Sequence, residues 1–249
     1  MSVTNVFETD NTRITCYDAD KPRLVISFDH WRMARHGFPD PNPSQFFAKN
    51  DMAFMTIYSA RNDWFLSLDL PALKQALSQF TKSFHHITSI GYSMGGYGAL
   101  LLSRATRANQ VVLVSPQSSI FPDRAPFETR YKTEAAMLDP KLDTLAQKPR
   151  RGLRGTLLFD PTIRIDAKHA KIILQSFPKI TATPLPFAGH PAMQTIAEAK
   201  LYRKVQNELL RKRIRPSEFL RLHKQARHSA PTYKDGLARY LAHRAARDL

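Results

Sequence analysis

The chain has 249 residues, 43% of them hydrophobic and 23% charged, so it can bury a sizeable core and does not resemble a disordered chain. No apolar run approaches the roughly 20 residues of a membrane span. The first residues lack a signal peptide, and a single cysteine, Cys16, excludes an internal disulfide and a thiolate zinc site, so we expect a cytoplasmic protein. The formal net charge of +16 attracts anions without choosing among nucleic acid, acidic lipid and anionic small molecules.

The first half of the chain alternates between strand-like and helix-like segments. Continuous β-branched and apolar runs predict buried strands, and apolar residues at helical spacing predict helices. In chain order, the predicted elements are a hairpin over 3–17, strands at 24–28 and 53–58, a helix at 71–82, a strand at 86–90, a helix at 95–104 and a strand at 111–115. This order predicts an α/β fold with a doubly wound, mostly parallel sheet.

The second half contains two departures from this alternation. Residues 118–154 hold several prolines and scattered aromatics, which predicts an insertion over one edge of the site; its acidic residues, such as Glu128, are expected on a solvated face. A strand at 156–159, a helix at 167–177 and a strand at 180–185 then resume the pattern. Beyond about Lys200, Leu, Ala, Arg and Lys at helical spacing predict two or three helices. We therefore divide the chain into a domain over 1–199 and a basic helical extension over 200–249.

A nucleophile motif lies between a predicted strand and a predicted helix. Residues 91–95 read Gly-Tyr-Ser-Met-Gly, which matches G-x-S-x-G in the strand-turn-helix context that this motif requires. The tight turn admits only very small side chains two residues before and after Ser93, and Gly91 and Gly95 supply them. The helix that follows directs backbone N–H groups at the serine, where they can hold an oxyanion. Ser93 is therefore the predicted nucleophile.

The predicted general base is His190, because it follows the last predicted strand directly. Two carboxylates are candidates for the acid that orients this imidazole: Asp160, at the end of the 156–159 strand, and Asp166, just before the next predicted helix. Asp160 could instead shape an Asp-Pro turn, and Asp166 could instead cap the helix. We favour Asp166, since a catalytic carboxylate usually lies a few residues beyond the strand.

Backbone N–H groups are the predicted oxyanion donors. Met94 N–H is the first donor, and His30 N–H, in the loop after the strand at 24–28, is the second. The chain has no HGGG-type run, which departs from the lipase and esterase pattern and argues against a lipase acting on bulky esters.

Gly91–Leu102, the segment with Asp160 and Asp166, and Gly189-His190 together resemble the α/β-hydrolase superfamily over about residues 20–200. The run at 91–100 and the Val-Ser-Pro-Gln at 114–117 are similar to a group of poorly characterised bacterial hydrolases. The resemblance implies a doubly wound eight-stranded sheet and ester or acyl chemistry without a metal. It implies no particular substrate, because one fold hosts many functions.

Three functional hypotheses follow. The leading one is hydrolysis of a carboxylic ester or thioester of a small molecule, glycan or lipid, through an acyl-enzyme on Ser93. Transfer of the acyl group to an alcohol uses the same residues and stays open. The third is an inactive scaffold whose basic C-terminal helices bind an anionic surface or a partner, such as a second copy of the chain, with nucleic acid disfavoured. No phosphate-binding loop, dinucleotide fingerprint or metal spacing is visible, so we expect no cofactor and no metal.

Overall fold

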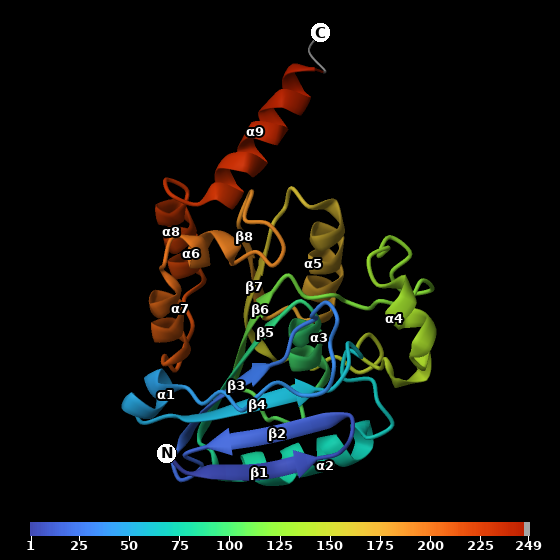
Figure 1. Ribbon diagram of the computed structural model, residues 1–249, viewed down its shortest axis with the longest axis vertical. Helices are drawn as coiled ribbons and strands as arrows, with labels where there is room; N and C mark the ends of the chain where they lie inside the picture. Colours follow the sequence, from blue (N-terminus) through green and yellow to red (C-terminus); the bar gives the residue numbers. More distant parts are fainter. Residues whose placement is uncertain (247–249) are drawn as a thin grey trace.

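The computed structural model describes residues 1–246 and contains one eight-stranded sheet (Figure 1). The strands are β1 (Val3–Glu8), β2 (Thr12–Tyr17), β3 (Arg23–Phe28), β4 (Ala53–Ser59), β5 (His86–Tyr92), β6 (Gln110–Val114), β7 (Arg154–Phe159) and β8 (Ile180–Pro184). Their spatial order is β1-β2-β4-β3-β5-β6-β7-β8. The predicted strands and the predicted hairpin are confirmed.

The sheet is parallel from β4 to β8 and antiparallel only at the β1–β2 end. The order reverses direction around β3: the chain first builds toward β4 and then crosses to β5 on the other side. All six parallel strands therefore end at one edge, called here the carboxyl edge, and begin at the other, called the amino edge. In such sheets ligands bind at the carboxyl ends beside the reversal, which is where β5 delivers Ser93.

Helices cover both faces of the sheet, as the alternation predicted. They are α1 (Gln45–Lys49), α2 (Leu70–Phe80), α3 (Met94–Leu101), α4 (Lys132–Met137), α5 (Arg164–Ser176), α6 (Gln194–Glu198), α7 (Tyr202–Leu209), α8 (Pro216–Ala226) and α9 (Pro231–Ala245). The sequence did not predict α1, α4 or α6, because one to two turns show no readable period.

Two hydrophobic clusters mark the two faces. Alternate residues of β3 point to opposite sides, so Leu24 and Ile26 pack with α2, α3 and α5, whereas Val25 packs with α1, α6, α7 and α8. The second cluster includes Val205 and Phe219, which are fully buried. The first two helices after residue 200 thus share the core of the sheet.

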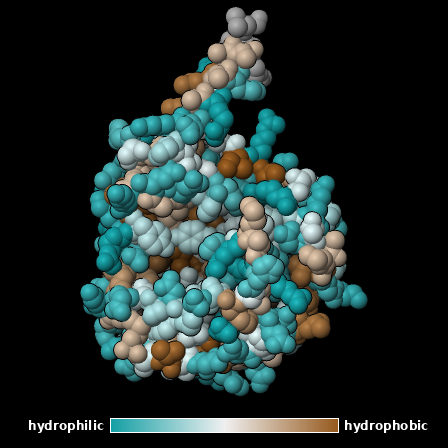
Figure 2. Space-filling model, in the orientation of Figure 1, coloured by the Kyte–Doolittle hydropathy of each residue, from teal (hydrophilic) through white to brown (hydrophobic). Residues whose placement is uncertain are grey.

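The last helix differs from the rest. α9 extends away from the body (Figure 1), and none of its side chains is buried. Residues 247–249 of the predicted basic extension, including Arg247, lie outside the described residues. On the face shown in Figure 2, hydrophilic residues dominate and hydrophobic ones are scattered. No helix in residues 1–246 is long and apolar enough to cross a membrane.

Candidate active site

Ser93 occupies a sharp turn between β5 and α3. Its φ of 49° and ψ of −115° are strained for a side chain with a Cβ. The flanking glycines are required by close backbone approaches: a Cβ on Gly91 would lie 2.1 Å from the carbonyl oxygen of Gly95, and a Cβ on Gly95 would lie 2.5 Å from that of Asp29. The turn therefore depends on both glycines, as predicted, and it also seats α3 against the end of β3.

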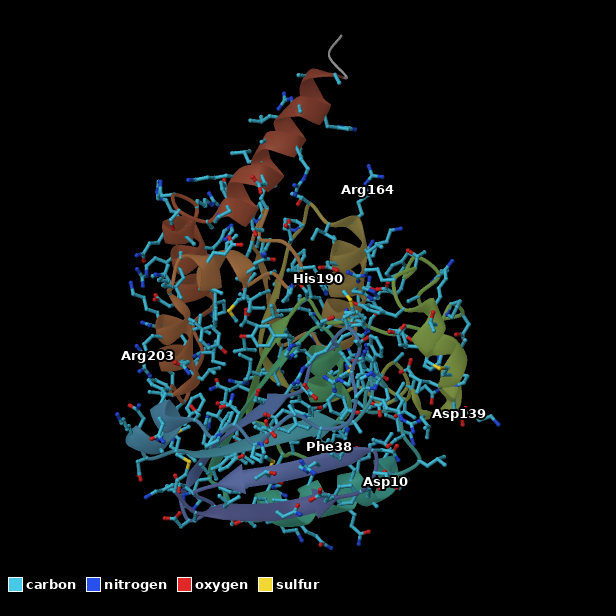
Figure 3. The ribbon with its side chains drawn as sticks, in the orientation of Figure 1. Asp10, Phe38, Asp139, Arg164, His190 and Arg203 are labelled. Carbon is cyan, nitrogen blue, oxygen red and sulfur yellow. The ribbon has the colours of Figure 1, made fainter. Side chains whose placement is uncertain are left out.

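A hydrogen-bonded chain links Ser93, His190 and Asp166. His190 Nε2 lies 3.1 Å from Ser93 Oγ, and His190 Nδ1 lies 2.7 Å from Asp166 Oδ2. A carboxylate only accepts hydrogen bonds, so Nδ1 carries the proton and Nε2 is free to accept from the serine hydroxyl. In Figure 3, His190 lies beside α5, the helix that carries Asp166. The geometry allows His190 to take a proton from Ser93.

The two candidate acids have different surroundings. Asp166 is the third residue of α5, which begins three residues earlier than predicted, so the alternative that it caps the helix is wrong: the cap position is Ile163. The hydrogen bonds of Asp160 go to groups other than the His190 imidazole. Asp160 accepts hydrogen bonds from the backbone N–H groups of Phe187 at 3.1 Å and Gly189 at 2.9 Å. Asp160 thus shapes the loop that carries His190, while Asp166 touches the imidazole itself.

Arg130, from the insertion, holds the other oxygen of Asp166. Its Nη1 lies 2.9 Å from Asp166 Oδ1, and its Nη2 lies 2.6 Å from Glu128 Oε2. Burial alone would raise the pKa of Asp166, but the hydrogen bond from His190 and the charges of His190 and Arg130 outweigh it, and the pKa is lowered. Asp166 therefore stays ionised and keeps one oxygen for His190.

Glu128 and His169 extend this network behind the site. Glu128 is 3% exposed, so the prediction of a solvated face is wrong for this residue. Its Oε2 lies 2.9 Å from His169 Nε2, and His169 Nδ1 accepts from the backbone N–H of Ser118 at 3.0 Å. Burial would raise the pKa of Glu128, but hydrogen bonds from His169 and Arg130 lower it to about 2. The insertion is thus tied by buried charge to α5, the helix that carries both His169 and Asp166.

Besides His190, the side chain of Gln117 also contacts Ser93, and the sequence did not predict this contact. Its Nε2 lies 3.0 Å from Ser93 Oγ, and its Oε1 accepts from Trp64 Nε1 at 3.0 Å. Because the indole N–H can only donate, it fixes the amide orientation and turns the NH₂ group toward Ser93. The position of Gln117 in the sequence could have indicated this contact. Gln117 lies three residues beyond β6, and β6 ends at the same edge of the sheet as its parallel neighbour β5, which leads to Ser93. Tyr131 adds a longer contact, 3.4 Å from the serine oxygen.

The two predicted oxyanion donors differ in availability. Met94 N–H is the first N–H of α3, and the N–H groups of a first helical turn have no carbonyl acceptor within the helix. This donor is therefore available for an oxyanion. His30 N–H donates to Asp29 Oδ1 at 3.0 Å. Asp29 in turn is held by Arg32 and Arg35, each at 2.7 Å. The prediction for His30 is therefore wrong in this geometry, because a buried, ion-paired carboxylate already uses that donor.

A cavity of about 470 Å³ lies next to the site. Tyr92 and Pro191, the chain neighbours of Ser93 and His190, line it together with Phe28, His30 and Met193. Within residues 1–246 no group of three or more His, Cys, Asp or Glu side chains could hold a metal ion.

Known proteins resemble this chain in fold. No protein-family model and no curated protein matches it. It is similar to the capsule O-acetyltransferase of Neisseria meningitidis serogroup A, at 17% identity and a TM-score of 0.53 over 80% of this chain and 92% of that chain. It is also similar to part of a glycosylation-associated protein complex of Streptococcus agalactiae, at 17% identity and a TM-score of 0.56 over 83% of this chain and 46% of that one.

A third similar structure is a candidate thioesterase from Silicibacter sp., at 15% identity and a TM-score of 0.50 over 76% of this chain and 77% of that one. At such identities the likeness concerns the fold. With the eight-stranded, mostly parallel sheet covered by helices, it defines the fold class of the chain as the α/β-hydrolase fold, as the sequence predicted.

Proposed function

We infer that the protein is a serine-dependent enzyme that cleaves carboxylic esters or thioesters through an acyl-enzyme on Ser93. The observation that carries this proposal is the contact chain from Ser93 Oγ through His190 to Asp166, with distances of 3.1 and 2.7 Å. A strained serine, a histidine with a free Nε2 and an ionised partner on its Nδ1 are the groups that acyl transfer requires.

The proposed reaction has two halves. Ser93 Oγ attacks the acyl carbon while its proton passes to His190 Nε2, and the carbonyl oxygen becomes an oxyanion that Met94 N–H stabilises. When the intermediate collapses, the bond to the alcohol or thiol breaks and His190 returns the proton to the leaving atom. Water then attacks the acyl-enzyme by the same steps, releasing the carboxylic acid and restoring Ser93.

Gln117 and Asp166 serve these steps in different ways. The Gln117 amide donates to the oxygen of Ser93 in the free enzyme, which places that oxygen for attack and leaves its own proton for His190. Asp166 stabilises the imidazolium that forms during each half. The mostly apolar cavity beside Tyr92 and Pro191 is the proposed seat of the acyl or leaving group.

Transfer of the acyl group to a hydroxyl acceptor is the second candidate. It differs only in replacing water by an alcohol in the second half. The likeness to a capsule O-acetyltransferase over 92% of that chain supports testing it. An inactive scaffold, by contrast, has no physical need for a strained serine in contact with a histidine that has a free Nε2.

A fluorophosphonate probe, followed by intact-mass analysis, tests the proposal. We expect the wild type to gain one phosphonyl group on Ser93, Ser93→Ala to gain none, and His190→Ala to react at least about 10³-fold more slowly, because the hydroxyl then lacks its base. An ester and thioester panel, with and without alcohol acceptors, then separates hydrolysis from transfer by the products formed.

Matched controls are Ser217→Ala and His228→Ala, which alter exposed side chains outside the network. Both should react like the wild type. A folded wild type that resists the probe, or equal labelling of Ser93→Ala, would remove the acyl-enzyme from consideration.

A further inference from the structure

The amino edge of the sheet carries two adjoining hollows lined by basic side chains. The larger, of about 570 Å³, lies over the first residues of β5, β6, β7 and β8, and its lysines and arginines are Arg154, Lys179, Lys212 and Arg213. The smaller, of about 430 Å³, is lined by Arg104, Arg107 and Arg150. Asn109 lines both, so the hollows are neighbours. These seven cations are called the amino-edge surface below.

None of the acidic side chains that the structure describes neutralises this surface. Within residues 1–246, no Asp or Glu lines either hollow. In the part of the chain that the structure describes, none of the seven cations forms an ion pair; the nearby Glu208 is committed to Arg215 and Arg211. Clustered like charges cost free energy that a bound anion would offset.

Two of the three arginines of the smaller hollow are held in place by neutral groups. Arg150 Nη1 donates to the carbonyl oxygens of Ser103 and Ala108 at 2.7 and 2.6 Å, and Arg104 Nη2 donates to that of Pro149 at 3.1 Å. Partial burial, together with the nearby charges of Arg104 and Arg107, lowers the pKa of Arg150. The guanidinium groups of Arg150 and Arg104 are therefore held by carbonyl oxygens, which leave their charge uncompensated.

The loop between α7 and α8 is pinned over the larger hollow. Buried Gln110, the first residue of β6, donates through Nε2 to the carbonyl oxygen of Arg211 at 2.7 Å and accepts at Oε1 from the N–H of Ile214 at 2.9 Å. Lys212 and Arg213 lie between these two fixed points. The backbone under both cations is thus set in the folded chain.

We propose that the amino-edge surface binds a linear polyanion through successive phosphate groups. A guanidinium presents paired donors that match phosphate oxygens, and lysines add point charges. Two neighbouring hollows accommodate two or more anionic groups of one chain. The ligand is recognised by its phosphates, because apart from His85 and His86 the single aromatic side chain lining the hollows is Phe84, which is only 8% exposed.

A lipid surface fits this face less well. The exposed large hydrophobic side chains of residues 1–246 are Met1, Val3, Met33, Leu68, Met137, Tyr202, Leu220, Tyr240 and Leu241, and none lines either hollow. A peripheral membrane site combines basic residues with apolar side chains that enter the bilayer. The amino-edge surface offers charge without such anchors.

The bound chain would not occupy the catalytic cavity. β5 runs from His86 at the larger hollow to Tyr92 beside Ser93, seven residues or roughly 20 Å at about 3.3 Å per residue. The proposed role is therefore anchoring: the polyanion holds the enzyme by one edge of its sheet and leaves the other edge open. This goes beyond the proposed ester chemistry and does not depend on it.

Fluorescence anisotropy with labelled inorganic polyphosphate and with oligothymidylate tests the proposal. We expect both to bind the wild type at low salt, with similar affinity per phosphate. In the variant Lys179→Gln/Lys212→Gln/Arg213→Gln, affinity should fall at least about tenfold and the logarithmic salt slope by about 0.7 for each cation removed. Arg104→Gln/Arg107→Gln should act in the same direction. If only polyphosphate or only oligothymidylate binds, the result identifies which kind of phosphate chain the site takes and still supports the proposal.

The control is Lys132→Gln/Lys224→Gln/Lys234→Gln, which removes three exposed lysines away from the hollows. It should bind like the wild type. The proposal is overturned if this control loses as much affinity as the amino-edge variant, if neither phosphate chain binds, or if anionic vesicles bind while both chains do not. Ser93→Ala should retain binding and the amino-edge variant should retain probe labelling, so failure of either proposal is seen separately.

Discussion

The two edges of the sheet handle positive charge in opposite ways. At the carboxyl edge Arg130 lies between Glu128 and Asp166, and Arg32 and Arg35 both bind Asp29. At the amino edge seven basic side chains surround two hollows that no Asp or Glu of residues 1–246 lines. The same chain, with a net charge of +16, thus pairs these three arginines with carboxylates at one edge and leaves the seven cations of the other edge without an ion pair among the described residues.

This contrast separates two uses of arginine. A cation fixed between carboxylates cannot attract a ligand strongly, but it holds the carboxylates in place and keeps them ionised, which suits a site that must move a proton between set positions. A cation with only carbonyl partners keeps its field for a ligand from solution. The net charge of the chain therefore does not predict what a given arginine does; the partners of that arginine decide its role.

The largest expected effect comes from comparing the two aspartates of the carboxyl edge. Asp166→Asn replaces the acceptor on His190 Nδ1 by an amide that can favour the wrong tautomer, so kcat on an ester substrate should fall by about 10⁴-fold with the fold intact. Asp160→Asn should leave the His190 tautomer unchanged and instead lower stability, because Asp160 accepts the N–H groups of Phe187 and Gly189. Steady-state kinetics and urea unfolding of both variants measure the two effects. Equal kcat losses in two stably folded variants would contradict the assignment of Asp166.

A smaller effect is expected at Gln117. Gln117→Leu removes the donor to Ser93 Oγ while keeping a similar volume. Because the amide positions the attacking oxygen rather than the substrate, kcat should fall by about 10²-fold with little change in KM. Trp64→Phe keeps an aromatic ring but frees the amide to rotate, and it should produce part of the same loss. A rise in KM at constant kcat would show that Gln117 binds substrate instead.

The sequence predicted the strands and the turn that carries Ser93, but not the side chains that surround Ser93, His190 and Asp166. Ser93 and His190 could be found because a strand, a tight glycine turn and a chain order constrain them. Arg130 and Glu128 come from the insertion, where no period predicts which side chain turns inward. Gln117 acts through an amide whose orientation depends on Trp64, more than fifty residues earlier in the chain. Such contacts arise from tertiary packing and leave no local pattern.

The remaining expected effect is on stability rather than on rate, and it concerns α8, which follows the basic loop of the amino edge and reaches the carboxyl-edge loop. Its buried His223 lies 3.0 Å from the carbonyl oxygen of Pro186 and 3.1 Å from Thr195 Oγ1. Burial, aided by the charge of Arg227, lowers the pKa of His223 to about 4. An unfolded chain would protonate this histidine near its ordinary value of about 6.5, so between these two values only the unfolded state takes up the proton.

The free energy of unfolding should therefore be highest above about pH 6.5 and fall by up to about 3 kcal/mol as the pH drops toward 4, through His223 alone. His223→Gln should be less stable at neutral pH but lose less stability on acidification, since glutamine does not titrate. Urea unfolding from pH 7.5 to about 4.5 measures both slopes, and the difference between wild type and variant isolates His223 from other groups, such as His169, whose pKa is also lowered by burial. Identical slopes in the two proteins would mean that a neutral His223 does not contribute to holding α8 in place.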